Sequence, residues 1–250
     1  MPFAIVSPRV FESAPVLDLH APDGFFSVPV AAAMWALAVV VIAISVRRAG
    51  RDFDERAIPL MGVTAAFIFA AQMINFPVLG GTSGHLLGAV LTAVLLGPWA
   101  GTLVMASVIA VQSLLFQDGG LLAMGANIVN MGLVGTIGGY AIYRSIARVL
   151  GGEERGRLPA AAIAAWCAVM LGAAVTSVEL AVSGTTTLAV VLPAMLGTHA
   201  LIGVGEALIT VGALALISSA RPDLLRLRDG GQTAPTSNGP ALEMLSLIHI

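Results

Sequence analysis

The sequence predicts an all-α, polytopic membrane protein with about seven transmembrane helices in one bundle. Hydrophobic residues make up 58% of the 250 residues and charged residues only 10%, whereas a soluble globular protein carries about 25% charged residues. Several apolar windows reach the roughly 20 residues that a helix needs to cross a bilayer. The one cysteine, Cys167, lies in an apolar run, which excludes a disulfide framework and a cysteine-ligated metal cluster.

The apolar windows follow a polar lead-in. Residues 1–27 mix Pro, Ser, Asp and Gly with scattered apolar residues and lack the basic start and unbroken apolar core of a secretory signal. The windows lie at residues 28–47, 57–75, 85–97, 99–116, 127–148, 160–182 and 188–219. The third is short, and we expect a tight turn at Gly97-Pro98. The last is long, with Pro193 near its start, so the sequence leaves open a broken helix or one preceded by a re-entrant segment.

The distribution of arginine predicts the orientation, because short cytoplasmic loops retain basic residues. All 12 basic residues are arginines, and all but Arg9 lie near the ends of the first, fifth and seventh windows or in the segments that follow them. These arginines are Arg47, Arg48, Arg51, Arg56, Arg144, Arg148, Arg155, Arg157, Arg221, Arg226 and Arg228. We therefore expect a multi-pass protein of the cell membrane with a cytoplasmic C-terminus. Without lysine, a Walker A ATPase and a Schiff-base enzyme are excluded, and nucleic-acid binding is disfavoured.

Polar side chains within membrane helices are costly, so each one is a candidate for a functional site. The sequence offers Gln72, Asn75, His85, Gln112, Asn127, Asn130, Glu179, His199 and Glu206. His20 and His85 should share the outer face, and two imidazoles on one face indicate a late transition metal. A solvated His20 and a hydrogen-bonded interfacial His85 are the alternatives. His199 and Glu206 share a helix face, which also fits a buried pair that only orients helices.

Several segments, taken in order, resemble the CbiM/NikM family, the substrate-capture (S) components of energy-coupling-factor transporters for cobalt and nickel. The segments are His20-Ala-Pro-Asp-Gly-Phe-Phe-Ser27, residues 59–77, Gly81-Thr-Ser-Gly-His-Leu-Leu-Gly88, Gly97-Pro-Trp-Ala-Gly101, residues 118–127 and residues 199–210. The resemblance covers residues 19–220 and implies a transmembrane metal-capture domain over that range.

The resemblance also implies a set of metal ligands. In the family, the metal is bound by a free amino terminus, by the amide and ring nitrogens of the adjacent histidine, and by a second histidine. Carried over, these are the amine of Leu19, the amide and ring of His20, and the ring of His85. Asn127, Asn130, His199 and Glu206 would orient the imidazoles by hydrogen bonds. Four nitrogens in a plane suit Ni(II), and Co(II) less strictly, so the ligand set does not separate the two metals.

The start and the end of the sequence depart from the family pattern. His20 follows 19 residues, and we hypothesise that translation begins at residue 19 through a UUG or CUG codon, so that residues 1–18 are a non-native extension. The alternative is a genuine extension and an altered or weaker metal site. We interpret residues 221–250 as a truncated cytoplasmic tail, in which the last six, Leu-Ser-Leu-Ile-His-Ile, match the translation of a sequencing adaptor.

The resemblance implies an importer that this chain cannot energise by itself, because the chain has no nucleotide-binding loop. The expected partners are a transmembrane coupling (T) subunit, ATPase (A) subunits, a small accessory membrane subunit and the lipid bilayer. Ni(II) or Co(II) would be the substrate, with no cofactor of the chain's own, and cobalt uptake would serve cobalamin biosynthesis. Two other functions remain as alternatives. One is capture of an organic vitamin, although the few aromatic residues provide little material for a pocket that stacks on a ring. The other is an intramembrane serine protease, with Ser83 as nucleophile and His199 as its base.

Overall fold

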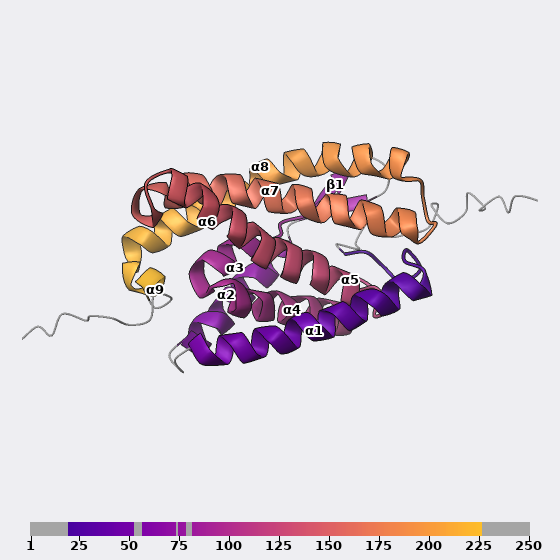
Figure 1. Ribbon diagram of the computed structural model, residues 1–250, viewed down its shortest axis with the longest axis horizontal. Coiled ribbons are helices and arrows are strands. Elements are labelled where there is room, and N and C mark those ends of the chain that lie inside the picture. The colour runs from indigo at the N-terminus through magenta and orange to yellow at the C-terminus, as the bar shows by residue number, and fades with distance from the viewer. Residues whose placement is uncertain (1–19, 53–56, 74, 79–81, 227–250) are drawn as a thin grey trace, which may run out of the picture.

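A computed structural model describes residues 20–52, 57–73, 75–78 and 82–226. In chain order, the elements are α1 (Val28–Asp52), α2 (Ala57–Gln72), β1 (Asn75–Val78), β2 (Thr82–His85), α3 (Ala89–Leu96), α4 (Pro98–Leu115), α5 (Met124–Ile128), η2 (Val129–Gly138), α6 (Gly139–Val149), α7 (Glu153–Val182), α8 (Leu188–Ala220) and α9 (Pro222–Arg226). Figure 1 shows the helices bundled side by side. The expectations for residues 1–18, for Leu19 and for residues 227–250 lie outside the described part of the chain.

The expected class, a helical membrane protein, is confirmed. Within the described ranges, α1, α4, α7 and α8 are long and apolar enough to cross a membrane, and α2 is a shorter apolar helix. The segments α5, η2 and α6 follow one another without a break and form one further rod (Figure 1). Large apolar side chains such as Val39 on α1 and Leu201 on α8 are exposed, which suits a surface that faces lipid.

The third predicted window differs from the expectation of a spanning helix. Helix α3 has eight residues, all of them buried, and at about 1.5 Å per residue it covers less than half of the hydrocarbon core. It starts after Gly88 and ends at Gly97, whose φ angles are 72° and 81°. Pro98 then opens α4, a position where proline costs no hydrogen bond, so the tight turn is present as expected.

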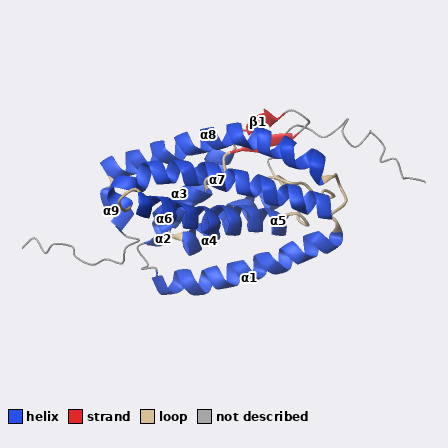
Figure 2. Cartoon of the chain, turned by 45° about the horizontal axis from the view of Figure 1, so that its top comes forward, coloured by secondary structure: helices blue, strands red, loops and turns tan. Residues whose placement is uncertain are grey.

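The chain reaches α3 through a β-hairpin that the apolar pattern did not predict. Strands β1 and β2 pair antiparallel, with Asn75 opposite His85, and Figure 2 shows them beside α8. The hairpin and the residues after it bring His85 to the start of a helix that is buried on all sides.

The last predicted window is one continuous helix, so neither the broken helix nor the re-entrant segment is correct. Helix α8 contains Pro193 within its second turn. A proline that close to a helix start removes few intrahelical hydrogen bonds, and the helix continues past it. The result is a long rod that packs along α7 for most of its length (Figure 1).

The arginine-bearing helix ends lie together. The end of α1, the α6–α7 connection and the end of α8 lie at the same end of the bundle, on the left in Figure 1. The loop after α4 and the α7–α8 connection lie at the opposite end, and these described connections carry no arginine. Among the described residues, the arginines therefore gather at one end of the bundle, which is the kind of asymmetry on which the positive-inside rule is based.

Close contact between α1 and α5 depends on Gly125. A Cβ atom at this position would lie 2.7 Å from the Cα and the backbone nitrogen of Trp35, and the Trp35 indole N–H donates to Leu121 O at 3.0 Å. Small residues at such positions let helix backbones approach in membranes.

We predict that Gly125→Ala lowers the thermal unfolding midpoint of the detergent-solubilised protein by several degrees, because overpacking of this kind costs about 1–3 kcal/mol. Gly138→Ala is the matched control, since a Cβ atom there meets nothing within 4 Å. Equal midpoints for the two variants would contradict the close contact of α1 with α5.

Candidate metal site

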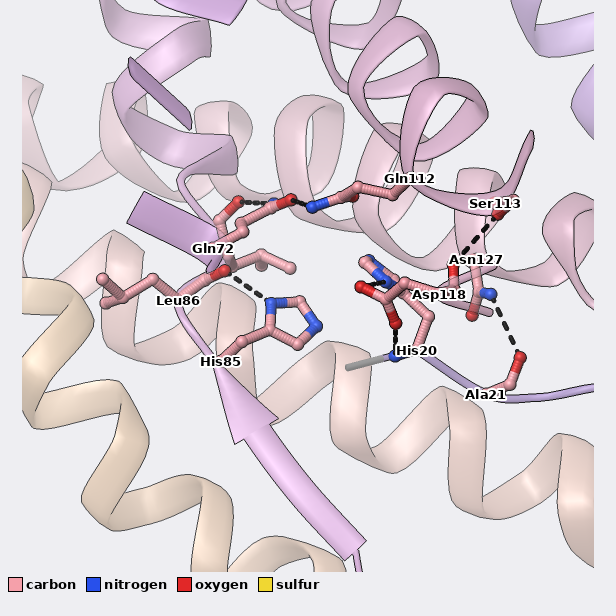
Figure 3. A network of polar contacts seen from close by, with 10 residues as sticks. His20, Ala21, Gln72, His85, Leu86, Gln112, Ser113, Asp118 and Asn127 are labelled. Atoms are coloured by element: carbon pink, nitrogen blue, oxygen red, sulfur yellow. Dashed lines mark hydrogen bonds and ion pairs between the residues drawn. The ribbon is translucent and has the colours of Figure 1, made fainter. Parts of the chain in front are cut away.

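Two histidines that are far apart in the sequence meet in the fold. The ring centroids of His20 and His85 lie 4.6 Å apart, with the ring planes inclined by 47°. Figure 3 shows His85 at the end of β2, facing His20 in the segment that leads into α1. His20 is only 6% exposed, so the solvated loop histidine that the sequence left open is not what the fold contains.

His20 is held by Asp118, in the loop after α4. The backbone N–H of His20 donates to Asp118 Oδ1 at 3.2 Å, and His20 Nδ1 lies 3.3 Å from Asp118 Oδ2. Neither ring nitrogen of His20 makes a hydrogen bond within the described part of the chain. Asp118 is itself fixed, because its N–H donates to Gln112 O at 3.1 Å and its carbonyl accepts from Ser113 Oγ at 3.3 Å.

Two glycines allow the loop after α4 to close over the His20 segment. Gly119 has a φ of 81°, and a Cβ atom there would lie 2.7 Å from His20 Cβ and 3.1 Å from Asn127 Nδ2. A Cβ atom on Gly120 would fall 1.8 Å from Asp23 Oδ1. Both positions therefore require glycine, one for backbone conformation and both for space.

The same loop is tied to the lead-in by further hydrogen bonds. Asp23 Oδ1 accepts the N–H groups of Leu122 at 2.8 Å and Ala123 at 3.1 Å. Asn127 Nδ2 donates to Ala21 O at 3.4 Å. Asn127, expected near the metal, thus contacts the residue next to His20.

His85 has one ring nitrogen engaged and the other directed at His20. Its Nδ1 lies 2.7 Å from Leu86 O. A carbonyl oxygen only accepts, so Nδ1 carries the hydrogen and Nε2 keeps its lone pair. In Figure 3, the second ring nitrogen of His85 points to the side on which His20 lies. Burial, and then the charge of His20, lowers the pKa of His85 from 6.5 to about 3, which keeps the ring neutral.

The backbone after His85 is bound by Glu206 of α8. Leu87 N–H donates to Glu206 Oε2 at 2.8 Å, and Gly88 N–H donates to Oε1 at 2.6 Å. The Glu206 side chain is buried, with 2% of the residue exposed. Glu206, expected to orient an imidazole, therefore acts on the main chain that carries His85. Within the described residues it makes no hydrogen bond to His199.

Two other expected residues make their hydrogen bonds to groups other than the two imidazoles. Asn130 Nδ2 donates to Glu179 Oε2 at 2.8 Å and to Thr176 Oγ1 at 3.1 Å, so it joins η2 to α7. His199 Nδ1 bonds to Met195 O at 2.8 Å, one turn earlier in α8. Ser83, the nucleophile of the protease alternative, lies in β2, and its side chain is outside the described part of the structure.

The side chains at this place do not complete a metal site by themselves. Within the described residues, no group of three or more His, Cys, Asp or Glu is arranged to hold a metal ion. A metal bound between His20 and His85 would therefore need main-chain nitrogen as well. Asp118, Gln72 and Gln112 frame the pair (Figure 3). The sequence offered Gln72 and Gln112 as polar candidates without a role at the metal, and it did not single out Asp118.

The lowered pKa of His85 predicts that this residue makes the fold more sensitive to acid. Between pH 6.5 and about 3, the unfolded chain binds a proton at His85 and the folded chain does not, so the contribution of His85 to stability falls as the pH falls through this window. We expect the thermal midpoint of His85→Gln to drop less than that of the parent between about pH 7 and pH 5. Equal drops would contradict the lowered pKa.

The comparisons with known proteins place the chain in one family. A family model described as the cobalt uptake substrate-specific transmembrane region, CbiM, matches residues 20–224. A putative fused nickel transport protein NikMN of Archaeoglobus fulgidus is 41% identical over 209 residues, which is 83% of this chain and 68% of that protein. A putative metal transport protein of Haloquadratum walsbyi is 39% identical over 83% of this chain and 93% of that protein.

More distant relatives and solved structures agree. The cobalt transport protein CbiM of Geobacter sulfurreducens is 28% identical over 85% of this chain and 63% of that protein. The crystal structure of a truncated transition metal transporter is similar, with a TM-score of 0.74 and 32% identity, over 79% of this chain and 97% of that one. The two imidazoles thus occur in a fold shared with metal transporters, and the chain belongs to the CbiM family.

Proposed function

We propose that this chain is the metal-capture (S) component of an ATP-driven energy-coupling-factor importer, and that it binds Ni(II) or Co(II) as its substrate between His20 and His85. The observation that carries the proposal is the pair of imidazoles 4.6 Å apart. Both ring nitrogens of His20 are buried and make no hydrogen bond within the described residues. Buried polar atoms in such a place are costly unless they are satisfied, and a late transition metal would satisfy them.

Stereochemistry assigns the donor atoms. A metal bound to the amide nitrogen of His20 closes a six-membered chelate ring only with Nδ1 of the same residue. Both of these nitrogens face Asp118, at 3.2 and 3.3 Å. The amide must lose its hydrogen to bind the metal, and that hydrogen is already directed at a carboxylate. Metal affinity should therefore decrease in acid.

His85 would supply the third nitrogen. Its Nδ1–H donates to Leu86 O, and a histidine that binds a metal usually donates its other N–H to a carbonyl or a carboxylate in this way. The fourth donor in the proposal is the amine of residue 19, present as a chain terminus if translation starts at Leu19. Three or four nitrogens in one plane favour Ni(II), with Co(II) as the second candidate.

The proposal has metal entering from outside and the ATPases acting from the cytoplasm. His20 and His85 lie away from the arginine-bearing end of the bundle, and the positive-inside rule assigns that end to the cytoplasm. A coupling subunit, ATPase subunits and an accessory membrane subunit, separate or fused, would complete the importer. The relatives named fused nickel transport proteins support nickel as substrate, and those named cobalt transport proteins support cobalt.

Four residues were expected to support the metal ligands without binding the metal themselves. Of these, Asn127 and Glu206 have the contacts that best fit such a role. Asn127 fixes Ala21, and Glu206 fixes Leu87 and Gly88, so each acts on the main chain next to a proposed ligand. His199 and Asn130 bond elsewhere, and in the proposal their effects on metal binding are smaller.

Substitution of the two histidines tests the proposal. His20→Ala and His85→Ala should each weaken Ni(II) binding to the purified protein by more than about 100-fold. This exceeds the loss of about 10–100-fold that is typical when a residue hydrogen-bonded to a metal ligand is replaced. Isothermal titration with Ni(II) and with Co(II) measures this. His199→Ala is the histidine control and should weaken binding by no more than about tenfold. Parent-like Ni(II) affinity in both His20→Ala and His85→Ala would refute the site.

Glu206→Gln tests the support of the His85 loop. The amide replaces one of the two accepting oxygens with an NH₂ group, which can only donate, so one of the two backbone N–H groups loses the oxygen that now accepts it. We therefore expect about 10–100-fold weaker Ni(II) binding. Glu179→Gln is the matched control, because Glu179 is also a buried glutamate but bonds to Asn130 of η2. If the two variants bound Ni(II) with the same affinity, Glu206 would have no special role in holding His85.

A further inference from the structure

Two glutamine side chains lie fully buried between the two histidine-bearing segments. Gln72, the last residue of α2, and Gln112, in the last turn of α4, are each 0% exposed. An amide in the interior of a membrane bundle is costly to bury. The proposed function uses neither side chain as a ligand.

The hydrogen-bond partners fix the orientation of both amides. Gln72 Nε2 lies 2.9 Å from Leu87 O, and since a carbonyl only accepts, the NH₂ group of Gln72 must point there. The oxygen of Gln72 therefore faces Gln112, whose Nε2 donates to it at 3.0 Å. Neither side chain can flip without losing a bond.

The amide pair joins the supports of the two histidines. At one end, Gln72 donates to the carbonyl of Leu87. The residue before it, Leu86, accepts the Nδ1 hydrogen of His85. At the other end, the main-chain oxygen of Gln112 accepts the N–H of Asp118, and Asp118 accepts the N–H of His20. Figure 3 shows three parts of this row, the contacts of His85 with Leu86, of Gln72 with Gln112, and of Asp118 with His20.

The pair is not the least costly way to fill this space. The oxygen of Gln112 is buried and makes no hydrogen bond within the described residues, and an unsatisfied buried acceptor destabilises a fold. Two apolar side chains of similar size would avoid this cost. Unlike apolar side chains, the two amides connect the end of α2, the end of α4 and the loop before α3 through directional hydrogen bonds.

We propose that the Gln72–Gln112 pair is a positioning element that sets the separation of His20 and His85, and with it the planar arrangement of nitrogens offered to the metal. The proposal rests on the proposed function, since it concerns the same site. Ni(II) is bound most favourably by nitrogens in a plane, whereas Co(II) accepts other geometries. Loss of the hydrogen bond between Gln72 and Gln112 should therefore weaken the binding of Ni(II) more than the binding of Co(II).

The test compares Gln72→Met, Gln112→Met and the double variant in the full chain, purified in detergent. Methionine keeps the length of the side chain and removes the donor. Each single variant should bind Ni(II) about 10–100-fold more weakly, lose Co(II) affinity by a smaller factor, and show an altered Ni(II) absorption spectrum. The double variant should be no weaker than the single variants by more than about twofold, because both residues belong to one row of bonds.

Thr102→Val is the control, since Thr102 is equally buried on α4 but bonds to Gly132 and Thr136. Gln112→Asn keeps the amide but is too short to reach Gln72, so it serves as a second variant should Gln112→Met fail to fold. It should also weaken Ni(II) binding.

The outcomes separate the two proposals. If the unsubstituted chain binds neither metal, the proposed function fails, and the positioning role fails with it. If the unsubstituted chain binds Ni(II), His20→Ala abolishes binding, and the glutamine variants keep the parental spectrum and the parental ratio of Ni(II) to Co(II) affinity, only the positioning role is overturned. That last result would leave the amides as structural groups.

Discussion

The structure depends on hydrogen bonds that satisfy a non-helical backbone inside an apolar bundle. Unpaired N–H and C=O groups are strongly unfavourable at membrane depth, so irregular segments persist there only where the protein itself supplies partners. The segment between β2 and α3 meets this requirement. Glu206 accepts the N–H groups of Leu87 and Gly88, and Gln72 donates to the carbonyl of Leu87. Because this short stretch is held from α8 and from α2, His85 can reach the interior and face His20.

The second half of the site follows from the same requirement on the other side. The segment before α1 is not helical either, and its polar groups find partners in the loop after α4. Asp118 accepts from His20, Asn127 donates to Ala21, and Asp23 accepts from the start of the α5 region. Two glycines permit the close approach. Each histidine thus lies on or directly beside a non-helical segment that a buried carboxylate from another part of the chain fixes.

The fold class, the basic end of the bundle and the two histidines could be predicted from the sequence, because composition, arginine placement and a family resemblance are local or linear signals. The third and last windows were not predicted correctly. An apolar run gives no sign that α3 is buried on all sides and too short to span, or that Pro193 lies close enough to a helix start to be tolerated. Asp118 was missed, and Gln72 and Gln112 were candidates without an assigned role, since what these three residues do depends on contacts between segments distant in sequence. Asn130 and His199 were expected near the metal from motif position alone, and their hydrogen bonds run to other partners.

The central claim is that a metal ion is held by nitrogens of His20 and His85, and X-ray absorption at the nickel edge of the Ni(II)-loaded protein tests it most directly. The account predicts a low-coordinate, nearly planar shell of nitrogen donors with the outer-shell scattering typical of imidazole rings, and the loss of part of that scattering in His85→Ala. A six-coordinate shell of oxygen donors without imidazole scattering would contradict it.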